Sequence, residues 1–411
     1  MRPWNLSHYA ISSCVTAALL AGCALPLSLS KVQGDMQPPV GAPPTIPQSR
    51  ALAARGDTSN YKVLYYFYGK HDGALPTASL VAVQRKLYGT TTRGGTGWGT
   101  VFSIVSSGTE KVLYRFKNEP DGVAPRAGLI DVKGPLYGTT GYGGAYSNGT
   151  VFSSTTSGME KVLYSFHSET DGSSPAASLI DVGGTLYGTT ALGGAHGVGT
   201  VFRVTTSGAE KVLHSFGGPR DGASPLASLV DVGGTLYGTT QSGGADNFGA
   251  IFSITTRGTE KALYSFHSGT DGSFPEAGLV YADGTLYGTT SYGGARGFGT
   301  VFSVTTSGKE KVLSSFGGTA GAYPMAGLID ADGTLYGTTP YGGTHNSGTV
   351  FSVTTSGTEK ILHNFSGGSD GSRPYAALLD VAGVLYGTTL RGGGSKNCGA
   401  SGCGTVFALS P

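Results

Sequence analysis

Six aspartates recur at equivalent places along the chain, each followed by Gly. One carboxylate per repeat could supply an oxygen ligand to Ca²⁺, although calcium needs six to eight oxygens and only one carboxylate recurs in each loop. An Asp before Gly is also typical of a turn in which the carboxylate caps backbone N–H groups. We prefer the turn and keep calcium as the alternative; no other cofactor is predicted. The aspartates are Asp72, Asp121, Asp171, Asp221, Asp271 and Asp370, and the sixth repeat has Ala320 and Gly321 instead.

A second set of residues that could do chemistry stands in Gly-rich segments between the repeated motifs. Aromatic rings with a few polar groups suit sugar rings or extended peptides, and loops on a rigid scaffold commonly carry binding. These residues therefore predict a binding face for a glycan or an envelope protein. They are Trp98, Tyr142, Tyr146, His196, Phe248, Tyr292, Phe298, Tyr341, His345 and Arg391.

Catalytic motifs find less support in the sequence. The eight His fall at unrelated places, and no Gly-x-Ser-x-Gly elbow lies between a strand and a helix. We expect a surface binding or scaffolding module rather than an enzyme. A lyase or hydrolase acting on an extracellular polymer is the first alternative, with a site assembled from several repeats. A purely structural envelope protein is the second.

Two cysteines, Cys398 and Cys403, lie close together near the end of the chain. In an exported domain such a pair predicts a disulfide. The loop that it closes is very short, so it adds little to global stability. A metal site is the weaker reading, since no second pair of ligands lies nearby in the sequence.

The first residues are typical of an export signal. Residues 9–21 form an apolar run that is too short to span a bilayer as a helix. The run ends in Leu20-Ala21-Gly22-Cys23, which resembles the bacterial lipobox; the resemblance implies cleavage before Cys23 and lipidation of that residue. We therefore predict a signal peptide over 1–22, a lipidated Pro-rich tether over 23–56 and a folded domain over 57–411. The lipid would anchor an exported protein to a membrane, expected to be the bacterial outer membrane or the cell surface.

The folded part consists of one unit repeated seven times. The motif Leu-Tyr-Gly-Thr-Thr recurs with spacings of 49, 50, 50, 50, 49 and 50 residues between its tyrosines. A period near 50 indicates a solenoid, an array or a propeller. Of the 411 residues 71 are Gly and 52 are charged, yet 38% are apolar, which excludes wholesale disorder. The net charge of +2 and the lack of a long basic run exclude nucleic acid as an expected partner, and we expect a monomer.

Each unit contains four strand-like runs divided by turn signals. In one unit they begin at Pro175, Thr185, Gly199 and Glu210; we name the four runs a, b, c and d. Four short strands in about 50 residues are typical of a propeller blade. The array begins with a strand d, residues 62–67, and ends with a strand c. The sequence therefore predicts an all-β, seven-bladed propeller whose N-terminal strand completes the last blade.

The repeated Phe and Gly residues are predicted to be structural. The Phe residues of strands c and d, such as Phe202 and Phe216, should fill the space between blades. The Gly of strand b, such as Gly188, is expected to allow close approach of a neighbouring backbone. The Gly-Gly pairs, such as Gly143-Gly144, should supply positive φ in the b–c loop.

The repeated motifs resemble a known family. The segments Gly-Thr-Leu-Tyr-Gly-Thr-Thr, Gly-Thr-Val-Phe-Ser, Ser-Gly-x-Glu-Lys-Val-Leu and Asp-Gly-x-x-Pro are similar to the GloVer tandem repeat. The resemblance covers residues 61–410. It implies a bacterial exported repeat protein with one of several anchoring signals, and it implies no particular activity.

Overall fold

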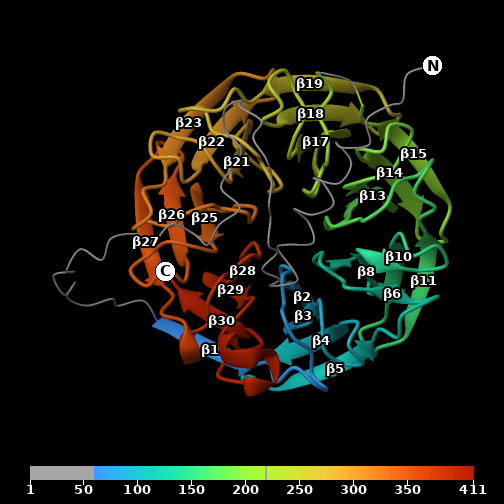
Figure 1. The fold of residues 1–411 in the computed structure, drawn as a ribbon, viewed down its shortest axis with the longest axis vertical. Helices are drawn as coiled ribbons and strands as arrows, with labels where there is room; N and C mark the ends of the chain where they lie inside the picture. The colour runs from blue at the N-terminus through green and yellow to red at the C-terminus, as the bar shows by residue number, and fades with distance from the viewer. Residues whose placement is uncertain (1–59, 218–219) are drawn as a thin grey trace, which may run out of the picture. The chain divides into compact units, whose positions relative to one another are not determined.

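The computed structural model describes residues 60–217 and 220–411. Within them the chain forms seven four-stranded antiparallel sheets arranged around one axis, as Figure 1 shows. The predicted seven-bladed β-propeller is confirmed. The predicted signal peptide, Cys23 and the Pro-rich tether lie outside the described residues.

The first three blades each run outward from a short inner strand to a six-residue outer strand. Blade 1 consists of β2 (Val81–Val83), β3 (Lys86–Thr91), β4 (Thr100–Val105) and β5 (Glu110–Arg115). Blade 2 consists of β7 (Ile130–Asp131), β8 (Leu136–Thr140), β10 (Thr150–Ser154) and β11 (Glu160–Ser165), with a small extra sheet of β6 (Gly122–Val123) and β9 (Tyr142–Gly143). Blade 3 consists of β12 (Ile180–Val182), β13 (Thr185–Thr190), β14 (Thr200–Thr205) and β15 (Glu210–Ser215).

The next three blades repeat the same order. Blade 4 consists of β16 (Val230–Val232), β17 (Thr235–Thr240), β18 (Ala250–Thr255) and β19 (Glu260–Ser265). Blade 5 consists of β20 (Val280–Ala282), β21 (Thr285–Thr290), β22 (Thr300–Thr305) and β23 (Glu310–Ser315). Blade 6 consists of β24 (Ile329–Ala331), β25 (Thr334–Thr339), β26 (Thr349–Thr354) and β27 (Glu359–Asn364).

Blade 7 is completed by the start of the described chain. It contains β28 (Leu379–Val381), β29 (Val384–Thr389), β30 (Thr405–Ser410) and β1 (Asn60–Tyr66). Strand β1 pairs antiparallel with β30, in a register that places Asn60 opposite Ser410 and Tyr66 opposite Thr405. The strand exchange predicted from the ends of the array is therefore present. Two short 3₁₀ helices, η1 (Gly368–Asp370) and η2 (Lys396–Ser401), lie in loops of this blade.

The inner strands are shorter than the sequence suggests. In blade 3, strand a spans Ile180–Val182 and does not begin at Pro175 as expected. The residues before it bond to the preceding blade: the carbonyl oxygen of Ala177 accepts a hydrogen bond from Thr139 Oγ1 at 3.2 Å. Equivalent threonine bonds recur around the ring, and Thr388 Oγ1 donates to the carbonyl of Ala78, joining blade 7 to blade 1. The segment that follows the Pro of each repeat therefore bonds to the preceding blade, and does not extend the inner strand of its own blade.

Phenylalanine pairs fill the boundaries between blades, as predicted. Phe216 of blade 3 meets Phe252 of blade 4 edge to face with ring centroids 5.1 Å apart, and both are fully buried. The strand-b glycine makes room for this ring, and not for a neighbouring backbone as expected. A Cβ on Gly238 would lie 2.6 Å from Cζ of Phe252 on the paired strand. The b–c Gly-Gly pairs do adopt positive φ, for example 79° and 78° at Gly143 and Gly144.

Candidate functional site

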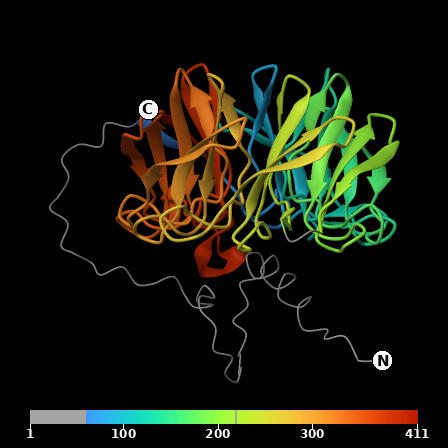
Figure 2. The same ribbon diagram turned by 90° about the horizontal axis from the view of Figure 1, so that it is seen from above.

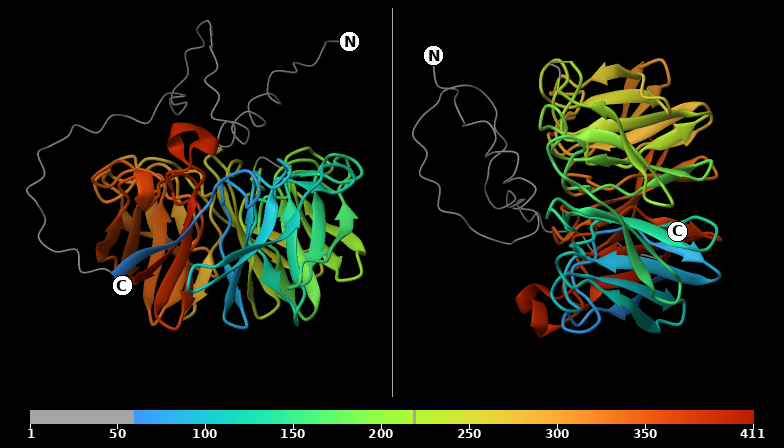
Figure 3. Two further views of the ribbon diagram at one scale, coloured as in Figure 1. Left: turned by 90° about the horizontal axis from the view of Figure 1, so that it is seen from below. Right: turned by 90° about the vertical axis from the view of Figure 1, so that its right-hand side faces the viewer.

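The long loops gather on one face of the propeller, which we call the loop face. Figures 2 and 3 show the b–c and d–a connections on one side, with η2 projecting from the same side. Within a blade the two loops pair by a short bridge, as between Ser273 and Tyr292. Each b–c loop is also bonded to the next blade, since Phe274 N donates to the carbonyl of Phe248 at 2.8 Å. These bonds make the loop face a continuous, braced surface.

Side chains from several blades converge where the loops lead into the innermost strands. We call this set the inner rim. Its members come from the variable positions beside the repeated Gly-Gly and Pro residues: Arg93, Arg126, Glu276, Tyr292, Tyr323, Tyr341, Arg373, Tyr375 and Arg391. The innermost strands of neighbouring blades contact one another, which brings these positions together around the axis.

One part of the inner rim, formed by Tyr292, Tyr323 and Tyr341, belongs to a row of aromatic rings across blades 4, 5 and 6 that we call the aromatic belt. Consecutive ring centroids lie 5.8 Å apart between Phe248 and Phe274, 5.8 Å between Phe274 and Tyr292, and 5.0 Å between Tyr292 and Tyr323. Tyr341 continues the row, 6.0 Å from Tyr323. Phe298 also packs edge to face on Tyr323. The belt offers adjoining apolar ring faces with hydroxyl groups along it.

The other part of the inner rim is a group of arginines on blades 7, 1 and 2. Burial and the neighbouring Arg373 and Arg93 lower the pKa of Arg391. Burial, and to a lesser extent Arg93, lowers the pKa of Arg126, whose guanidinium lies over the ring of Tyr142. The Nε atoms of Arg126 and Arg391 are buried and have no hydrogen-bond partner among the described residues. Each of these two arginines therefore keeps one N–H donor without a hydrogen-bond partner among the described residues, close to other cations. Guanidinium N–H groups form strong hydrogen bonds with anions.

Hydroxyl groups and one carboxyl complete the rim. Tyr341 Oη and Tyr375 Oη lie 3.1 Å apart, and the guanidinium of Arg373 lies 5.3 Å from the centre of the Tyr341 ring. Gln241 Nε2 donates to Glu276 Oε1 at 2.9 Å. Burial raises the pKa of Glu276, and burial together with Glu276 raises that of Tyr292 to about 12. The phenol of Tyr292 therefore stays a protonated donor near neutral pH.

The residues predicted for the binding face divide into two groups. Tyr142, Phe248, Tyr292, Phe298, Tyr341 and Arg391 belong to the inner rim or pack against it. The others lie on loop tips. Tyr146 packs against His167, with ring centroids 3.9 Å apart and ring planes tilted by 36°. The His196 ring lies against Gly217, and Trp98 and His345 are exposed. The structure does not bring the second group to the rim.

Six residues of the inner rim were not predicted. One of them, Arg93, stands in a b–c loop directly before Gly94. The other five come from the d–a loops, whereas the predicted binding face was drawn from the b–c loops: Arg126, Glu276, Tyr323, Arg373 and Tyr375. Each directly precedes or follows the Pro of Asp-Gly-x-x-Pro, in a position whose residue type changes from blade to blade. That variation beside an invariant turn is the signal that could have identified them.

The repeated motifs decide the family. The model of the Gloeobacter/Verrucomicrobia repeat matches residues 52–196, 97–295 and 184–407. The chain belongs to this repeat family. The GloVer resemblance predicted from the sequence is therefore confirmed. No curated protein matches the chain.

Solved structures share the fold of this repeat protein at low identity. Virginiamycin B lyase from Staphylococcus aureus matches with a TM-score of 0.58 and 14% identity, covering 86% of this chain and 99% of the lyase chain. A gluconolactonase from Xanthomonas campestris has a TM-score of 0.40 and 16% identity, covering 70% of this chain and 87% of the gluconolactonase chain. Quinohemoprotein alcohol dehydrogenase from Comamonas testosteroni has a TM-score of 0.48 and 11% identity, covering 85% of this chain and 76% of the dehydrogenase chain. The likeness to virginiamycin B lyase shows the β-propeller fold alone.

The repeated aspartates of the GloVer units cap their own turns. Asp121 Oδ2 accepts hydrogen bonds from Tyr114 Oη at 2.8 Å and from Lys117 N at 2.9 Å. Asp72, Asp171, Asp221, Asp271 and Asp370 likewise bond to the strand-d Tyr or His and to a backbone N–H. These bonds match the turn interpretation. Calcium binding by the six carboxylates stays a prediction.

The last b–c loop of the GloVer array carries the disulfide between Cys398 and Cys403. It packs on the segment after β1: Asn397 Nδ2 donates to the carbonyl of Tyr68 at 2.8 Å, and a Cβ on Gly69 would lie 2.8 Å from both sulfur atoms. A cavity of about 250 Å³ adjoins this loop and reaches Arg373 and Arg391. The disulfide loop therefore borders both the strand exchange and the arginine group.

Across residues 60–217 and 220–411, no helix combines the length and the apolar character needed to cross a bilayer.

Proposed function

We propose that this protein is an exported, lipid-anchored β-propeller that binds an acidic glycan at the inner rim of its loop face. The observation that carries the proposal is the convergence of four arginines beside the aromatic belt. Carboxylates accept paired hydrogen bonds from guanidinium groups, and the apolar faces of sugar rings stack on aromatic side chains. The Nε–H groups of Arg126 and Arg391, buried without partners among the described residues, would be satisfied by such a ligand.

The charge of the rim supports an anionic ligand over a neutral one. The rim residues include four arginines and one carboxyl, Glu276, and burial raises the pKa of that carboxyl. Arg93 contributes to lowering the pKa of both Arg126 and Arg391, as expected for cations held close together. A bound uronate carboxylate would relieve this repulsion.

The glycan proposal is tested by titrating the purified full chain with polygalacturonate, and with neutral dextran for comparison, in a calorimeter. We expect binding of the acidic polymer only, weakened by salt. Arg391→Gln and Arg126→Gln should each weaken it about tenfold or more, because a charge-assisted hydrogen bond contributes about 1.5–3 kcal/mol.

Tyr146→Phe is the control, since this ring lies on a loop tip and keeps its contact with His167. Equal binding of dextran, or full affinity in both arginine variants, would contradict the proposal. If the rim captured an envelope protein and bound no glycan, the partner of this surface would be a protein and the glycan proposal would be wrong.

A lyase acting on the same acidic polymer is the second candidate function. Glu276 favours it, because a buried carboxyl with a raised pKa can accept a proton near neutral pH. Ionised Glu276 would take the proton from the carbon next to the uronate carboxylate, and the electron pair of that C–H bond would form a C=C bond as the neighbouring C–O bond breaks. The departing oxygen would take a proton from solvent and leave as a hydroxyl group, so the remaining sugar is unsaturated. Ultraviolet absorbance of that product, lost in Glu276→Gln, would establish the enzyme; polymer that stays intact would exclude this activity.

Anchoring is tested separately at Cys23. We expect Cys23→Ala to move the protein from the membrane fraction to the soluble exported fraction, because acyl chains hold a protein by burying methylenes at about 0.8 kcal/mol each. Cys14→Ala, inside the apolar run, is the matched control and should leave fractionation unchanged. Membrane association that persists in Cys23→Ala would contradict the lipid anchor.

A further inference from the structure

Three side chains meet wherever one blade packs on the next, and we call each such meeting a seam. The first residue lies near the end of strand d, the second is the Asp of the following turn, and the third begins strand d of the next blade. In the seam between blades 2 and 3 the turn Asp is bonded to Tyr164, and Glu210 of the next strand is the third residue. Tyr164 Oη donates to Asp171 Oδ2 at 2.6 Å.

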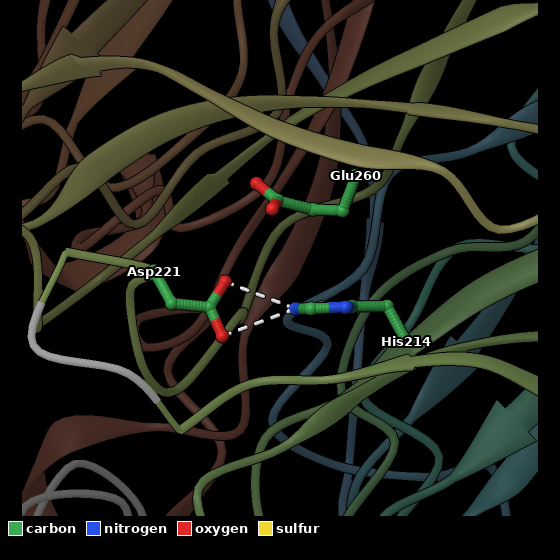
Figure 4. A group of neighbouring side chains, drawn as sticks. All are labelled: His214, Asp221 and Glu260. Atoms are coloured by element: carbon green, nitrogen blue, oxygen red, sulfur yellow. Dashed lines mark hydrogen bonds and ion pairs between the residues drawn. The ribbon is translucent and has the colours of Figure 1, made fainter.

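The seam between blades 3 and 4 carries a different set: His214 on β15, Asp221 in the turn and Glu260 at the start of β19. His214 Nε2 lies 2.9 Å from Asp221 Oδ1, and one ligand atom from each of the three residues lies within 4.8 Å of the other two. Figure 4 shows the three side chains pointing toward one another.

No other described seam places the ligand atoms of an imidazole and two carboxylates within 4.8 Å of one another. In the seam of Glu210, His167 Nδ1 lies 3.1 Å from Asp171 Oδ2, but it does not join such a group. Tyrosine stands in the place of His214 at the seams of Glu110, Glu160, Glu210 and Glu310. The seam of Glu359 has Ser314 and Ala320, and the seam of His363 and Asp370 has Tyr61 in the place of Glu. The seam between blades 3 and 4 therefore combines an imidazole in the place of the usual phenol with both carboxylates.

We propose that His214, Asp221 and Glu260 bind a Zn²⁺ ion between blades 3 and 4. Zinc is held by imidazole nitrogen and by carboxylate oxygen, often with three protein ligands and a water in the fourth position. Calcium fits this set less well, because it takes oxygen ligands in larger number. A phenol at the same place donates a hydrogen bond to the Asp, whereas neutral imidazole can present a lone pair.

The local contacts leave room for an ion. Glu260 Oε1 is buried and has no hydrogen-bond partner among the described residues, so a ligand to it displaces no protein contact. The side chains of His214 and Asp221 are 22% and 17% exposed, which leaves a route for the ion and for one water. In the absence of metal, His214 hydrogen-bonds to Asp221; zinc would replace the proton between them. Zinc binding should therefore weaken in acid.

The test is a titration of the metal-free full chain with Zn²⁺ near neutral pH, followed by a chromophoric chelator in competition and by thermal unfolding. We expect one Zn²⁺ per chain and a higher Tm when it is bound. His214→Tyr restores the usual seam residue, so the propeller should fold. The His214→Tyr variant should bind Zn²⁺ at least roughly 10–100-fold more weakly than the wild type. Loss of a residue that only hydrogen-bonds to a ligand already costs roughly that much affinity, and His214 is itself a ligand in the proposal.

Three further variants make the outcome decisive. Tyr264→His places imidazole beside Asp271 and Glu310 in the next seam and should raise the stoichiometry to two. His363→Tyr removes a histidine from a seam without Glu and should leave zinc binding unchanged. Wild-type chain that binds no Zn²⁺ beyond the His214→Tyr level, or Glu260→Gln with full affinity, would overturn the proposal.

Discussion

Deleting residues 57–68 is expected to open the propeller and to lower its melting temperature strongly. The deletion removes β1, the outer strand of blade 7, and Phe67, which is fully buried against Phe102 of blade 1 with centroids 5.1 Å apart. Loss of a buried Phe side chain alone costs about 3–5 kcal/mol, a large share of the roughly 5–15 kcal/mol that stabilises a typical protein.

The deletion also creates a new sheet edge. Strand β30 would expose the backbone groups that now pair with β1, next to the buried Val406 and Phe407. Such an edge is a template for pairing with another chain. We therefore expect the shortened protein to dimerise or aggregate, as measured by light scattering, and to melt roughly 15 °C or more lower, since about 1 kcal/mol changes Tm by about 2–4 °C in a large domain.

A rearranged chain is the matched control for this deletion. Moving residues 57–68 behind the C-terminus, joined by a copy of the turn Thr206-Ser207-Gly208-Ala209, restores an outer strand by the c–d connection that the other blades use. We expect this chain to be monomeric with a Tm close to that of the wild type. A deletion variant that stays monomeric and melts at the wild-type temperature would contradict closure by β1.

The blades and their closure could be predicted from the sequence because they depend on residues that recur in order. The strand-d run at 62–67 and the final strand-c run leave one arrangement in which every sheet has four strands. Local details were less accessible. The role of Gly238 depends on the direction of the Phe252 ring across the ladder, which a one-dimensional pattern does not contain.

The inner rim and the seams could not be predicted because their residues meet only in three dimensions. Tyr375 and Glu276 are about two repeats apart in the chain, yet Glu276 contributes to the raised pKa of Tyr375. Glu210 begins β15 and Asp171 lies in the turn after β11, 39 residues earlier in the chain. In the folded chain the two carboxyls are close enough for Asp171 to raise the pKa of Glu210. Repeat comparison by itself marks such positions only where one copy differs, as His214 does.

The seams also predict that the propeller is more stable in mild acid than in mild base. Burial, and then repulsion by the neighbouring Asp, raises the pKa of Glu110, Glu160 and Glu210 to about 7 and that of Glu310 to about 8. Each has an Oε1 atom that is buried without a hydrogen-bond partner among the described residues. In the unfolded chain these carboxyls have a pKa near 4.3.

The direction follows from proton linkage. Between about pH 4.5 and pH 8 the folded chain holds protons that the unfolded chain has lost, so stability falls as the pH rises. After discounting for partial exposure, we expect about 1 kcal/mol per carboxyl, or about 4 kcal/mol for the four, and a Tm roughly 8–16 °C lower at about pH 8.5 than at about pH 5.5. Glu260 is left out of this count because it belongs to the proposed zinc site.

Changing all four glutamates to Gln should therefore raise the Tm in base and flatten its dependence on pH, because Gln keeps the shape without the charge. Thermal unfolding followed by circular dichroism across this range measures both effects. Glu169→Gln changes an exposed loop carboxylate and should do little. Glu359→Gln should do less than Glu210→Gln, since Ala320 replaces the repelling Asp in its seam and Ser314 Oγ donates to Glu359 Oε2 at 2.6 Å. A Tm that rises from pH 5.5 to about 8.5, or a fourfold variant that unfolds like the wild type in base, would show that these carboxyls are ionised in the folded chain without cost.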